Sequence, residues 1–553
     1  MTNSTLGIIK VRKRGLLLAS SLLSVMMYAQ TETEARKIRS LSNTAETVNF
    51  QKIKEKETPS PQELMAKAKQ MNIKYSDEYN GKMFQLVGFD EKGMPLYYET
   101  TNAGAAAGTG ADVLNDLSGP YKLDGEGVNV FEWDGGGVRV AHQEFGGRAK
   151  QMDSPLSTSD HATHVAGTLI AAGVDKKAKG MAYKANLKAY DWTSDLTEMA
   201  AAAANNAMLM SNHSYGFTGG FSYGSSSGNT GWHWMGDDSE TEFIGFGQYR
   251  TTDGDWDFLL TQNPYYLPVK AAGNPRGDGP APGGLHYVRI LENGKYVWKT
   301  STKVRQVNGG VDGFDTVNQG ATSKNTLIVA AAEKLPYGYR NPQDVKIASF
   351  SAFGPTDDGR IKPDITGIGV DLYSTNSTGN ADYFSISGTS MASPNVTGNI
   401  ALLQQHFNRL NASFMKSATT RALVIHTAKE AGDAPGPDYK HGWGLLDSKK
   451  AAEVISVRNK YSLLREETLE NGSLKEIDLV ASGNEPLKVT IAWTDPRPAV
   501  LSSPSVLDDP AKMLVNDLDI KITDGTNEYR PWVLDPANPA APATTGDNVR
   551  DNV

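Results

Sequence analysis

Cysteine is absent from this 553-residue sequence, which excludes disulfide bonds and metal sites built on thiolates. An excess of positive charge is absent too, since 55 Lys and Arg stand against 63 Asp and Glu and give a formal net charge of −8. The chain therefore lacks the basic footprint of a protein that binds nucleic acid. It also lacks glycine-rich loops of the Walker and dinucleotide types, so neither a nucleotide nor a redox cofactor is implied.

Long apolar runs are missing as well, with one exception at the N-terminus. Basic residues from Lys10 to Arg14 precede the apolar stretch 15–29, which is too short to cross a bilayer comfortably. This pattern predicts a signal peptide over residues 1–30, cleaved near Ala29. The alternative, a buried N-terminal helix, is disfavoured because the leucine run has no polar face. No later segment is apolar enough to anchor the protein, so we expect a secreted or cell-surface location.

The next region, residues 31–111, is predicted to be an N-terminal extension. Its first part is rich in Lys, Glu, Thr and Ser, with one helix-like stretch over 61–70. Residues 84–89 and 95–98 are typical of two short strands around a turn. Two interpretations stay open: a prosegment that is removed, or a retained extension that packs on the main domain.

Residues 112–457 are predicted to form the main domain. Apolar strands alternate there with helical runs, which indicates an α/β fold with a mainly parallel sheet and helices on both faces. A long glycine-rich stretch over 275–320 interrupts the alternation and is predicted to be an insertion. It either shapes substrate access or is surface elaboration without functional consequence. The strands are expected near 128–133, 186–191, 207–213, 265–272 and 326–332.

Residues 458–553 show a different, two-residue periodicity. Apolar side chains alternate with others over 487–493 and again over 518–522. This pattern predicts a C-terminal antiparallel β domain of the sandwich or jelly-roll type. No clear closing strand precedes Val553, so we expect the β domain to be truncated.

The strongest chemical signal is the segment Ser387-Gly388-Thr389-Ser390-Met391-Ala392-Ser393-Pro394. Apolar residues at helical spacing follow it, so Ser390 is predicted to stand at the start of a buried helix. A helix N-terminus directs free N–H groups and partial positive charge outward, which suits an oxyanion forming beside the serine. A serine hydroxyl is a weak nucleophile and needs a base within reach and a third group to orient that base.

Candidates for both partners lie upstream. Asp134 follows the apolar run 128–133 and precedes three glycines, so it is predicted to lie at the carboxyl end of a strand. His161 opens a small-residue segment that is predicted to begin a helix. The order Asp, His, Ser is one of the known arrangements of a serine-protease triad. Taken singly, each residue has an ordinary interpretation as a turn, cap or loop residue.

Around these residues the sequence resembles the subtilase family of serine proteases, peptidase family S8. The histidine block of that family differs here only by Ala162 in place of glycine. Within the family the chain is most similar to the alkaline-protease subgroup that carries a C-terminal β domain. The segments that carry the resemblance are Asp160-His161-Ala162-Thr163-His164-Val165-Ala166-Gly167-Thr168, Ala271-Ala272-Gly273-Asn274, Ser211-Asn212-His213-Ser214-Tyr215-Gly216, 350–364, His142-Gln143-Glu144-Phe145 and Gly436-Pro437-Asp438-Tyr439.

The resemblance implies a subtilisin-like fold and a serine endopeptidase acting on protein or peptide substrates. Asp134, His161 and Ser390 would form the triad, while Asn274 would donate to the oxyanion. His164 and His213 are expected to be structural.

The same resemblance implies the walls of the first specificity pocket. They would be formed by two segments, Ser214-Tyr215-Gly216 and Ala271-Ala272-Gly273. Because small walls admit large side chains, we expect an apolar or aromatic residue before the cleaved bond. The resemblance also favours a prosegment cleaved between about residues 100 and 112.

No cofactor is required for the expected chemistry. A structural calcium ion is compatible with the carboxylate-rich turns Asp508-Asp509 and Asn516-Asp517-Leu518-Asp519, although a solvated acidic turn is the simpler interpretation of each. The metal-binding residues and the oligomeric state stay unassigned.

Two other functions remain open. One is a catalytically inactive scaffold that binds without turnover, which the retention of Asp134, His161, Asn274 and Ser390 argues against. The other is a serine-carboxyl peptidase on the same scaffold, which has Glu in place of the base. His161 disfavours that alternative, and an acidic pH optimum would favour it.

Overall fold

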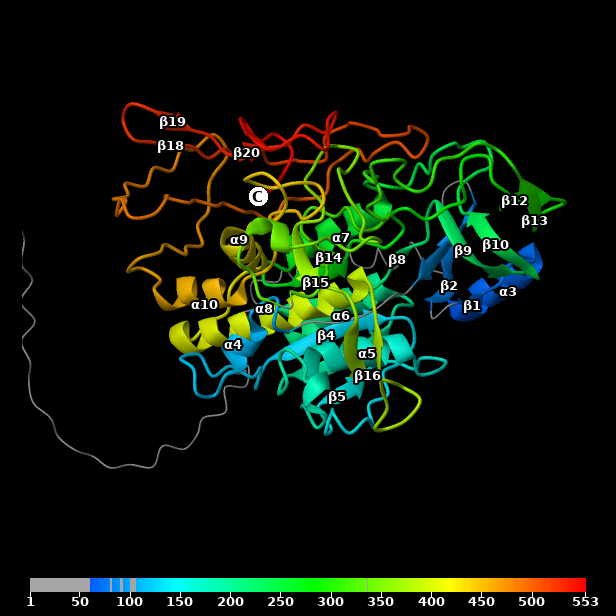
Figure 1. Cartoon of the computed structure of the whole chain (residues 1–553), viewed down its shortest axis with the longest axis horizontal. Coiled ribbons are helices and arrows are strands. Elements are labelled where there is room, and N and C mark those ends of the chain that lie inside the picture. The colour runs from blue at the N-terminus through cyan, green and yellow to red at the C-terminus, as the bar shows by residue number, and fades with distance from the viewer. Residues whose placement is uncertain (1–59, 80–81, 90–92, 100–105, 336) are drawn as a thin grey trace, which may run out of the picture.

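The computed structural model describes residues 60–79, 82–89, 93–99, 106–335 and 337–553 (Figure 1). The predicted signal peptide lies outside these residues. Within the described part, no helix combines the length and the apolar character needed to cross a membrane.

A seven-stranded sheet forms the centre of the molecule, and every neighbouring pair in it is parallel. Its strands are buried apolar runs such as β14, in which each residue from Leu327 to Ala332 is buried. Such runs are typical of parallel sheets covered on both faces. The predicted fold class is therefore confirmed. In spatial order the strands are β15 (Ile365–Ile368), β14 (Leu327–Ala332), β11 (Leu267–Ala271), β7 (Met210–His213), β4 (Asn129–Asp134), β6 (Asn186–Asp191) and β5 (Ala149–Gln151).

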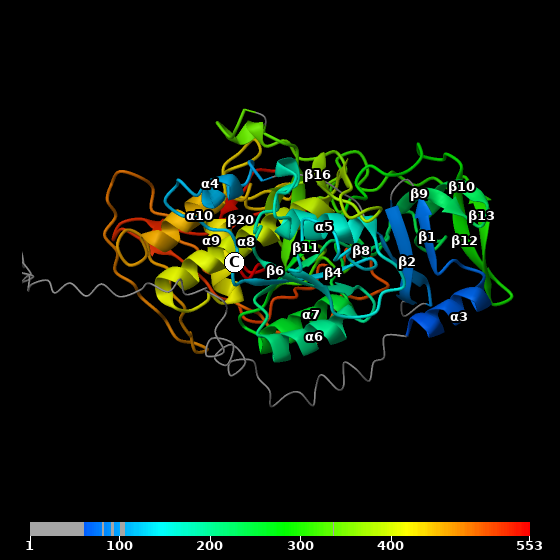
Figure 2. The ribbon, with the colours of Figure 1, turned by 90° about the horizontal axis from the view of Figure 1, so that it is seen from below.

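Helices cover both faces of this sheet. Figure 2 shows α6 (Asp195–Asn206) and α7 (Thr251–Gln262) on one side and α5 (Asp160–Ile170) and α8 (Thr389–Asn411) on the other. Successive side chains of a strand point to opposite faces, so β4 contributes to two separate apolar cores. The other helices of the main domain, within the described residues, are α4 (Ala111–Asn115), α9 (Ser417–Thr427), α10 (Ser448–Ser456) and the 3₁₀ turns Lys176–Ala178 and Pro342–Asp344.

The N-terminal extension forms a small antiparallel unit beside the main domain. Helix α3 (Pro61–Met71) begins with a capping box, in which Ser60 and Glu63 satisfy each other's backbone N–H groups. The predicted helix and strand pair are confirmed. In this unit β3 also pairs with the short strand β8 of the main domain. The strands are β1 (Ser76–Tyr79), β2 (Lys82–Phe89), β3 (Pro95–Glu99) and β8 (Gly216–Phe217).

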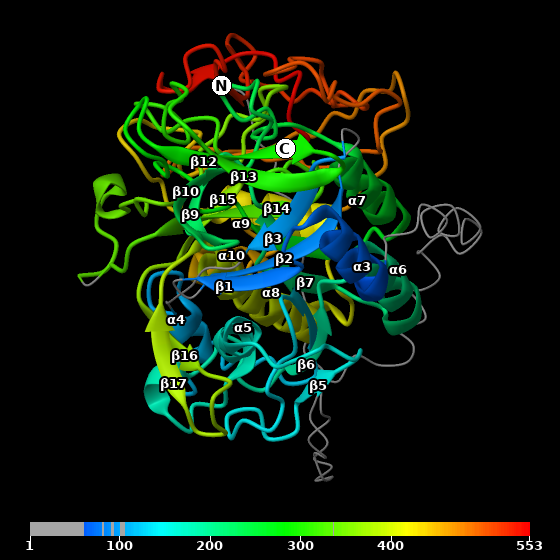
Figure 3. The same ribbon diagram turned by 90° about the vertical axis from the view of Figure 1, so that its right-hand side faces the viewer.

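The glycine-rich stretch 275–320 contains a β-hairpin. This hairpin extends a second four-stranded sheet, which lies next to the N-terminal unit in Figure 3, where β1 contacts β9 and α3 contacts β13. A separate antiparallel pair precedes the candidate nucleophile. The strands of the four-stranded sheet are β9 (Phe221–Ser226), β10 (Asn229–Trp234), β12 (His286–Glu292) and β13 (Lys295–Ser301), and the pair is β16 (Leu372–Thr375) with β17 (Tyr383–Ile386).

The C-terminal region is antiparallel, but its strands are much shorter than predicted. No strand forms over 487–493, where Leu487 and Val489 are 43% and 38% exposed, and only Ile522–Thr523 forms at the end of 518–522. Two-residue periodicity fixes which side chains share a face, but a stable sheet also needs a neighbouring strand. The pairs that do form are β18 (Ile522–Thr523) with β19 (Glu528–Tyr529) and β20 (Trp532–Val533) with β21 (Thr544–Thr545).

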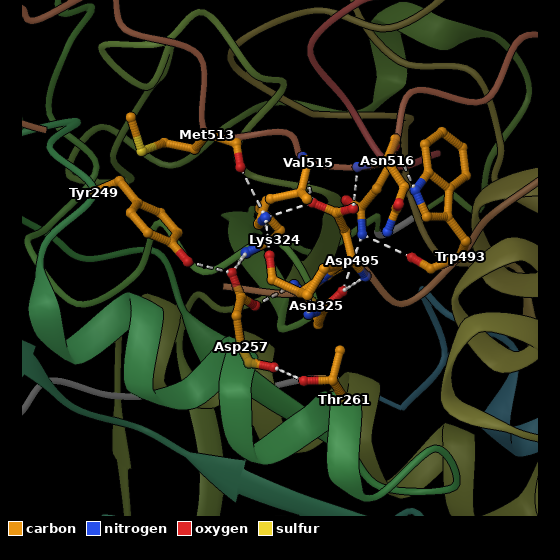
Figure 4. A network of polar contacts seen from close by, with 12 residues as sticks. Tyr249, Asp257, Thr261, Lys324, Asn325, Trp493, Asp495, Met513, Val515 and Asn516 are labelled. Atoms are coloured by element: carbon orange, nitrogen blue, oxygen red, sulfur yellow. Dashed lines mark hydrogen bonds and ion pairs between the residues drawn. The ribbon is translucent and has the colours of Figure 1, made fainter. Parts of the chain in front are cut away.

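A buried polar network holds this C-terminal segment against the main domain (Figure 4). The ammonium of Lys324 forms an ion pair with Asp495 and donates to the carbonyl of Met513 at 2.8 Å, and both charged side chains are fully buried. The Asp495 carboxylate also accepts from the backbone N–H groups of Val515 (2.9 Å) and Asn516 (2.7 Å). The segment is thus part of the folded main body.

Candidate active site

Asp134 is the last residue of β4 and is fully buried. Its Oδ1 accepts from the backbone N–H of Gly135 at 2.7 Å and contacts Nδ1 of His161 at 2.5 Å. A carboxylate held in this way fixes the orientation of the imidazole and stabilises its charged form. The predicted position of Asp134 at the end of a strand is confirmed.

A second carboxyl group lies one pleat further back on the same face of β4. Glu132 is fully buried, and neither of its side-chain oxygens has a hydrogen-bond partner among the described residues. Burial and the nearby charge of Asp134 hold the pKa of Glu132 well above its usual range. Burial thus favours the neutral form of Glu132 over its carboxylate.

His161 lies in the first turn of α5. Ser159 caps this helix by accepting from the backbone N–H of Ala162 at 3.2 Å, which satisfies one free donor of the first turn. The imidazole is 4% exposed. The Ser159 cap and the Asp134 carboxylate together fix the position of the imidazole ring and the nitrogen that faces Asp134. His161 lies at a helix start, as the sequence predicted.

Ser390 stands in the first turn of α8, after the N-cap Gly388. Its hydroxyl donates to the carbonyl of Ser214 at 2.9 Å, and the Ser214 hydroxyl donates back to the carbonyl of Ser390 at 2.5 Å. Ser214 directly follows β7, the neighbour of β4 in the sheet. The carboxyl ends of parallel strands meet at one edge, so Asp134 and Ser390 belong to the same edge of the sheet.

Asn274 is fixed by the residue next to Ser390. Its Oδ1 accepts from both the backbone N–H (2.8 Å) and the hydroxyl (2.9 Å) of Thr389. The Thr389 hydroxyl in turn accepts from the backbone N–H of Gly273 at 3.2 Å. Because the amide is planar, anchoring the oxygen directs the Nδ2 donor away from Thr389.

Ser390 and Asn274 line one small pocket with a free volume of about 10 Å³. Four of the six residues predicted as pocket walls lie there, but Ser214 lies under Ser390 and Ala272 packs in a core cluster. Asn318 and Thr389 complete the lining and were not predicted. The predicted wall residues in the lining are Tyr215, Gly216, Ala271 and Gly273.

His164 and His213, which lie in two of the motif segments, are buried and structural. His164 contacts the carbonyl of Leu372 through Nε2 at 3.1 Å, and burial lowers its pKa to about 3. His213 contacts the hydroxyls of Ser211 and Tyr215, while burial lowers its pKa well below the usual value. Both positions agree with the structural roles expected from the sequence.

No group of three or more His, Asp or Glu residues within the described ranges is arranged to hold a metal ion. Asp509 instead accepts from the backbone N–H groups of Ser503 and Ala511 in its own turn. Structural calcium therefore stays a prediction without assigned residues. A larger cavity of about 330 Å³ involves Phe407, near the far end of α8 from Ser390, and takes no part in this site.

Comparisons with known proteins give a family match and distant relatives. The model described as the subtilase family matches residues 138–444, which is more than half of the chain. A C5a peptidase of Streptococcus pyogenes serotype M3 is 33% identical over 138 residues, covering 24% of this chain and 11% of that protein. A PII-type proteinase of Lactococcus lactis subsp. cremoris is 33% identical over 125 residues, covering 20% and 6%. The matches thus span about a tenth or less of these relatives' length.

Solved structures of proteases are also similar. The CspB protease of Clostridium perfringens has a TM-score of 0.45 and 16% identity, with 64% of this chain and all of that chain covered. The prenylagaramide maturation protease PagA has a TM-score of 0.40 and 19% identity, covering 59% and 93%.

Proposed function

This chain belongs to the subtilase family, and from that membership we propose that it is a serine endopeptidase with Asp134, His161 and Ser390 as its triad. The observation that carries the proposal is the 2.5 Å contact between Asp134 and His161, at the sheet edge where Ser390 and Asn274 line one pocket. The family match supports peptidase activity for residues 138–444, and the proposal extends this activity to the whole protein.

In the proposed reaction, Oγ of Ser390 attacks the peptide carbonyl while His161 takes the hydroxyl proton. The C–N bond then breaks, His161 returns the proton to the leaving amine, and an acyl-enzyme remains on Ser390. Water, deprotonated by His161, releases the acyl group as a carboxylic acid and restores the serine. Asp134 stabilises the imidazolium that forms in each half of the reaction.

The oxyanion of each tetrahedral intermediate needs donors that are in place before the reaction. Nδ2 of Asn274 would donate to the oxyanion, and Thr389 fixes the plane of this amide by holding its oxygen. A backbone N–H near Ser390, in the first turn of α8, would be the second donor.

Labelling with a fluorophosphonate probe tests the nucleophile directly, because the probe reacts only with an activated serine. We expect wild-type protein to be labelled and Ser390→Ala to be unlabelled. Ser385→Ala is the matched control, since Ser385 is an exposed serine on β17 that contacts nothing in the proposed site. Persistent labelling of Ser390→Ala would remove Ser390 from this role, and labelling without peptide cleavage would favour a binding protein.

We also propose that residues 1–30 direct export and that residues 31–111 are a prosegment. The pairing of β3 with β8 supports the second proposal, because it opposes Glu99 to Gly216 and Tyr98 to Phe217. An extended substrate would need the same backbone edge at Gly216. While residues 60–99 remain attached, they therefore compete with substrate for this backbone edge.

Mass spectrometry of exported protein tests both proposals. We expect the wild-type N-terminus to lie between about residues 100 and 112, whereas Ser390→Ala keeps the extension and begins near Gln30. A wild-type protein that keeps the extension and is fully active would contradict the prosegment assignment.

A further inference from the structure

The side chain of Asn318 closes the small pocket beside Ser390. It lies between the two predicted walls: a Cβ on Gly216 would come 3.1 Å from its Nδ2, and one on Gly273 only 2.6 Å from its Cγ. The backbone N–H of Asn318 donates to the carbonyl of Ala272 at 3.2 Å, which fastens this residue to the second wall. The glycines provide space, and the Asn318 amide fills it.

The oxygen of this amide is buried without a hydrogen-bond partner among the described residues. Asn318 as a whole is 3% exposed. Buried polar atoms are nearly always paired, so an unpaired one at the end of a pocket calls for a ligand or a water molecule. The free volume of about 10 Å³ suits a group about the size of one water molecule.

We propose that Asn318 makes the first specificity pocket selective for a short polar side chain, namely Ser, Thr or Asn, in the residue before the cleaved bond. This inference rests on the proposed function, because it assumes that Ser390 attacks the carbonyl of that residue. It differs from the large apolar or aromatic residue predicted from the small walls.

Two physical effects favour a short polar side chain over an apolar or a large one. A hydroxyl or amide group both donates and accepts, so it satisfies the Asn318 amide in either orientation of that amide. An apolar side chain of the same size leaves the amide unpaired in a site from which it has excluded water. A large side chain has no room unless Asn318 moves.

The test uses peptide substrates that differ only in this one residue. Thr and Val have the same shape, so their ratio of kcat/KM reports the hydroxyl alone. We expect wild-type protein to prefer Thr over Val by about tenfold or more, and over Phe by about a hundredfold. A wild-type enzyme that cleaves after Phe or Val as fast as after Thr would overturn the proposal.

Two variants separate polarity from volume. Asn318→Leu keeps the branched outline of four heavy atoms and removes the polar amide, so we expect the preference for Thr over Val to be lost or reversed. Asn318→Gly opens the pocket, so we expect kcat/KM after Phe to rise about tenfold or more. An unchanged Thr-to-Val ratio in Asn318→Leu would contradict the assigned role.

Fluorophosphonate labelling distinguishes this inference from the function on which it rests. Labelled wild-type protein that prefers Phe retains the proposed function and overturns only the role of Asn318. Unlabelled wild-type protein that cleaves no substrate overturns both. Labelling of each variant shows that its site is folded before the rates are compared, and the wild-type ratios test the proposal even where a variant does not fold.

Discussion

At the scale of single residues, the site depends on a neighbour that performs no chemistry. Thr389 precedes Ser390 and holds the oxygen of Asn274 through two hydrogen bonds. The donor of Asn274 can stabilise an oxyanion without reorganisation only while this oxygen is held. Thr389 is thus a positioning residue for the proposed reaction.

Replacing Thr389 by Val removes the hydroxyl and keeps the shape. We expect kcat to fall about tenfold with KM little changed, which is less than the loss of about 10²–10³ seen when such a donor is itself removed in a member of this family. Thr427→Val is the control, since the Thr427 hydroxyl bonds only within α9, to the carbonyl of Leu423. A wild-type kcat in Thr389→Val would show that Asn274 is held without this hydroxyl.

The residues of the candidate site differ in how far the sequence could predict them. Asp134, His161 and Ser390 lie in segments with recognisable neighbours, so motif and order were enough to nominate them as candidates. Asn318 lies in a stretch of ordinary polar residues, and only the three-dimensional structure brings it against Gly216 and Gly273. No local sequence pattern predicts that contact.

At the scale of elements, the start of α5 connects stability to catalysis. The Ser159 cap and the Asp134 carboxylate act on the same first turn, in which His161 lies. Loss of an N-cap costs about 1 kcal/mol and frays the turn that it caps. A frayed turn at α5 would therefore displace the proposed base.

Two cap variants separate these effects. Ser159→Ala and Asp447→Ala each remove the side-chain acceptor of an N-cap, the first at α5 and the second at α10. We expect both to lower the free energy of unfolding by about 1 kcal/mol. Only Ser159→Ala should also lower kcat, because α10 carries no site residue. Equal activity in the two variants would mean that Asp134 alone positions His161.

The elements themselves were predicted unequally. Five of the seven parallel strands could be predicted because their apolar runs lie between helical segments, as over 327–332, whereas the short strands β5 and β15 were not predicted. The strands of residues 458–553 could not, because alternation over 487–493 does not say which segment would pair with them. Pairing is a property of two segments, and the sequence pattern describes only one.

At the scale of the whole molecule, the ion pair between Lys324 and Asp495 joins the main domain to the C-terminal segment. Breaking a buried pair by removing one partner leaves an uncompensated charge and costs about 3–5 kcal/mol. We expect Asp495→Ala to lose stability on this scale in denaturant unfolding. Glu292→Ala is the control, because its ion pair with Lys299 is about half exposed and contributes less than about 1 kcal/mol.

The contact between the C-terminal segment and the main domain also makes the stability of the protein depend on pH. Burial, followed by the charges of Asp315 and Asp508, raises the pKa of Asp357 to about 9. The charges of Asp358 and Asp509 are smaller contributions to the same rise. The folded state then keeps a proton that the unfolded state releases above about pH 4, so stability is lost as pH rises toward 9, by about 1.4 kcal/mol per pH unit at most.

Guanidinium unfolding at pH 5, 7 and 9 checks this pH dependence. We expect wild-type protein to lose stability over this range and Asp357→Asn to lose less, because the amide cannot ionise. A chelator keeps calcium, which remains a prediction for this chain, from neutralising the carboxylates. Parallel curves for the two proteins would show that Asp357 ionises freely in the folded state.

Only six positions separate Asn318, at the end of the substrate pocket, from Lys324, which fastens the C-terminal segment. The proposed choice of substrate and the attachment of the C-terminal segment therefore depend on residues of one short loop. We therefore expect an exchange of the C-terminal segment to alter the substrate preference proposed for Asn318 as well.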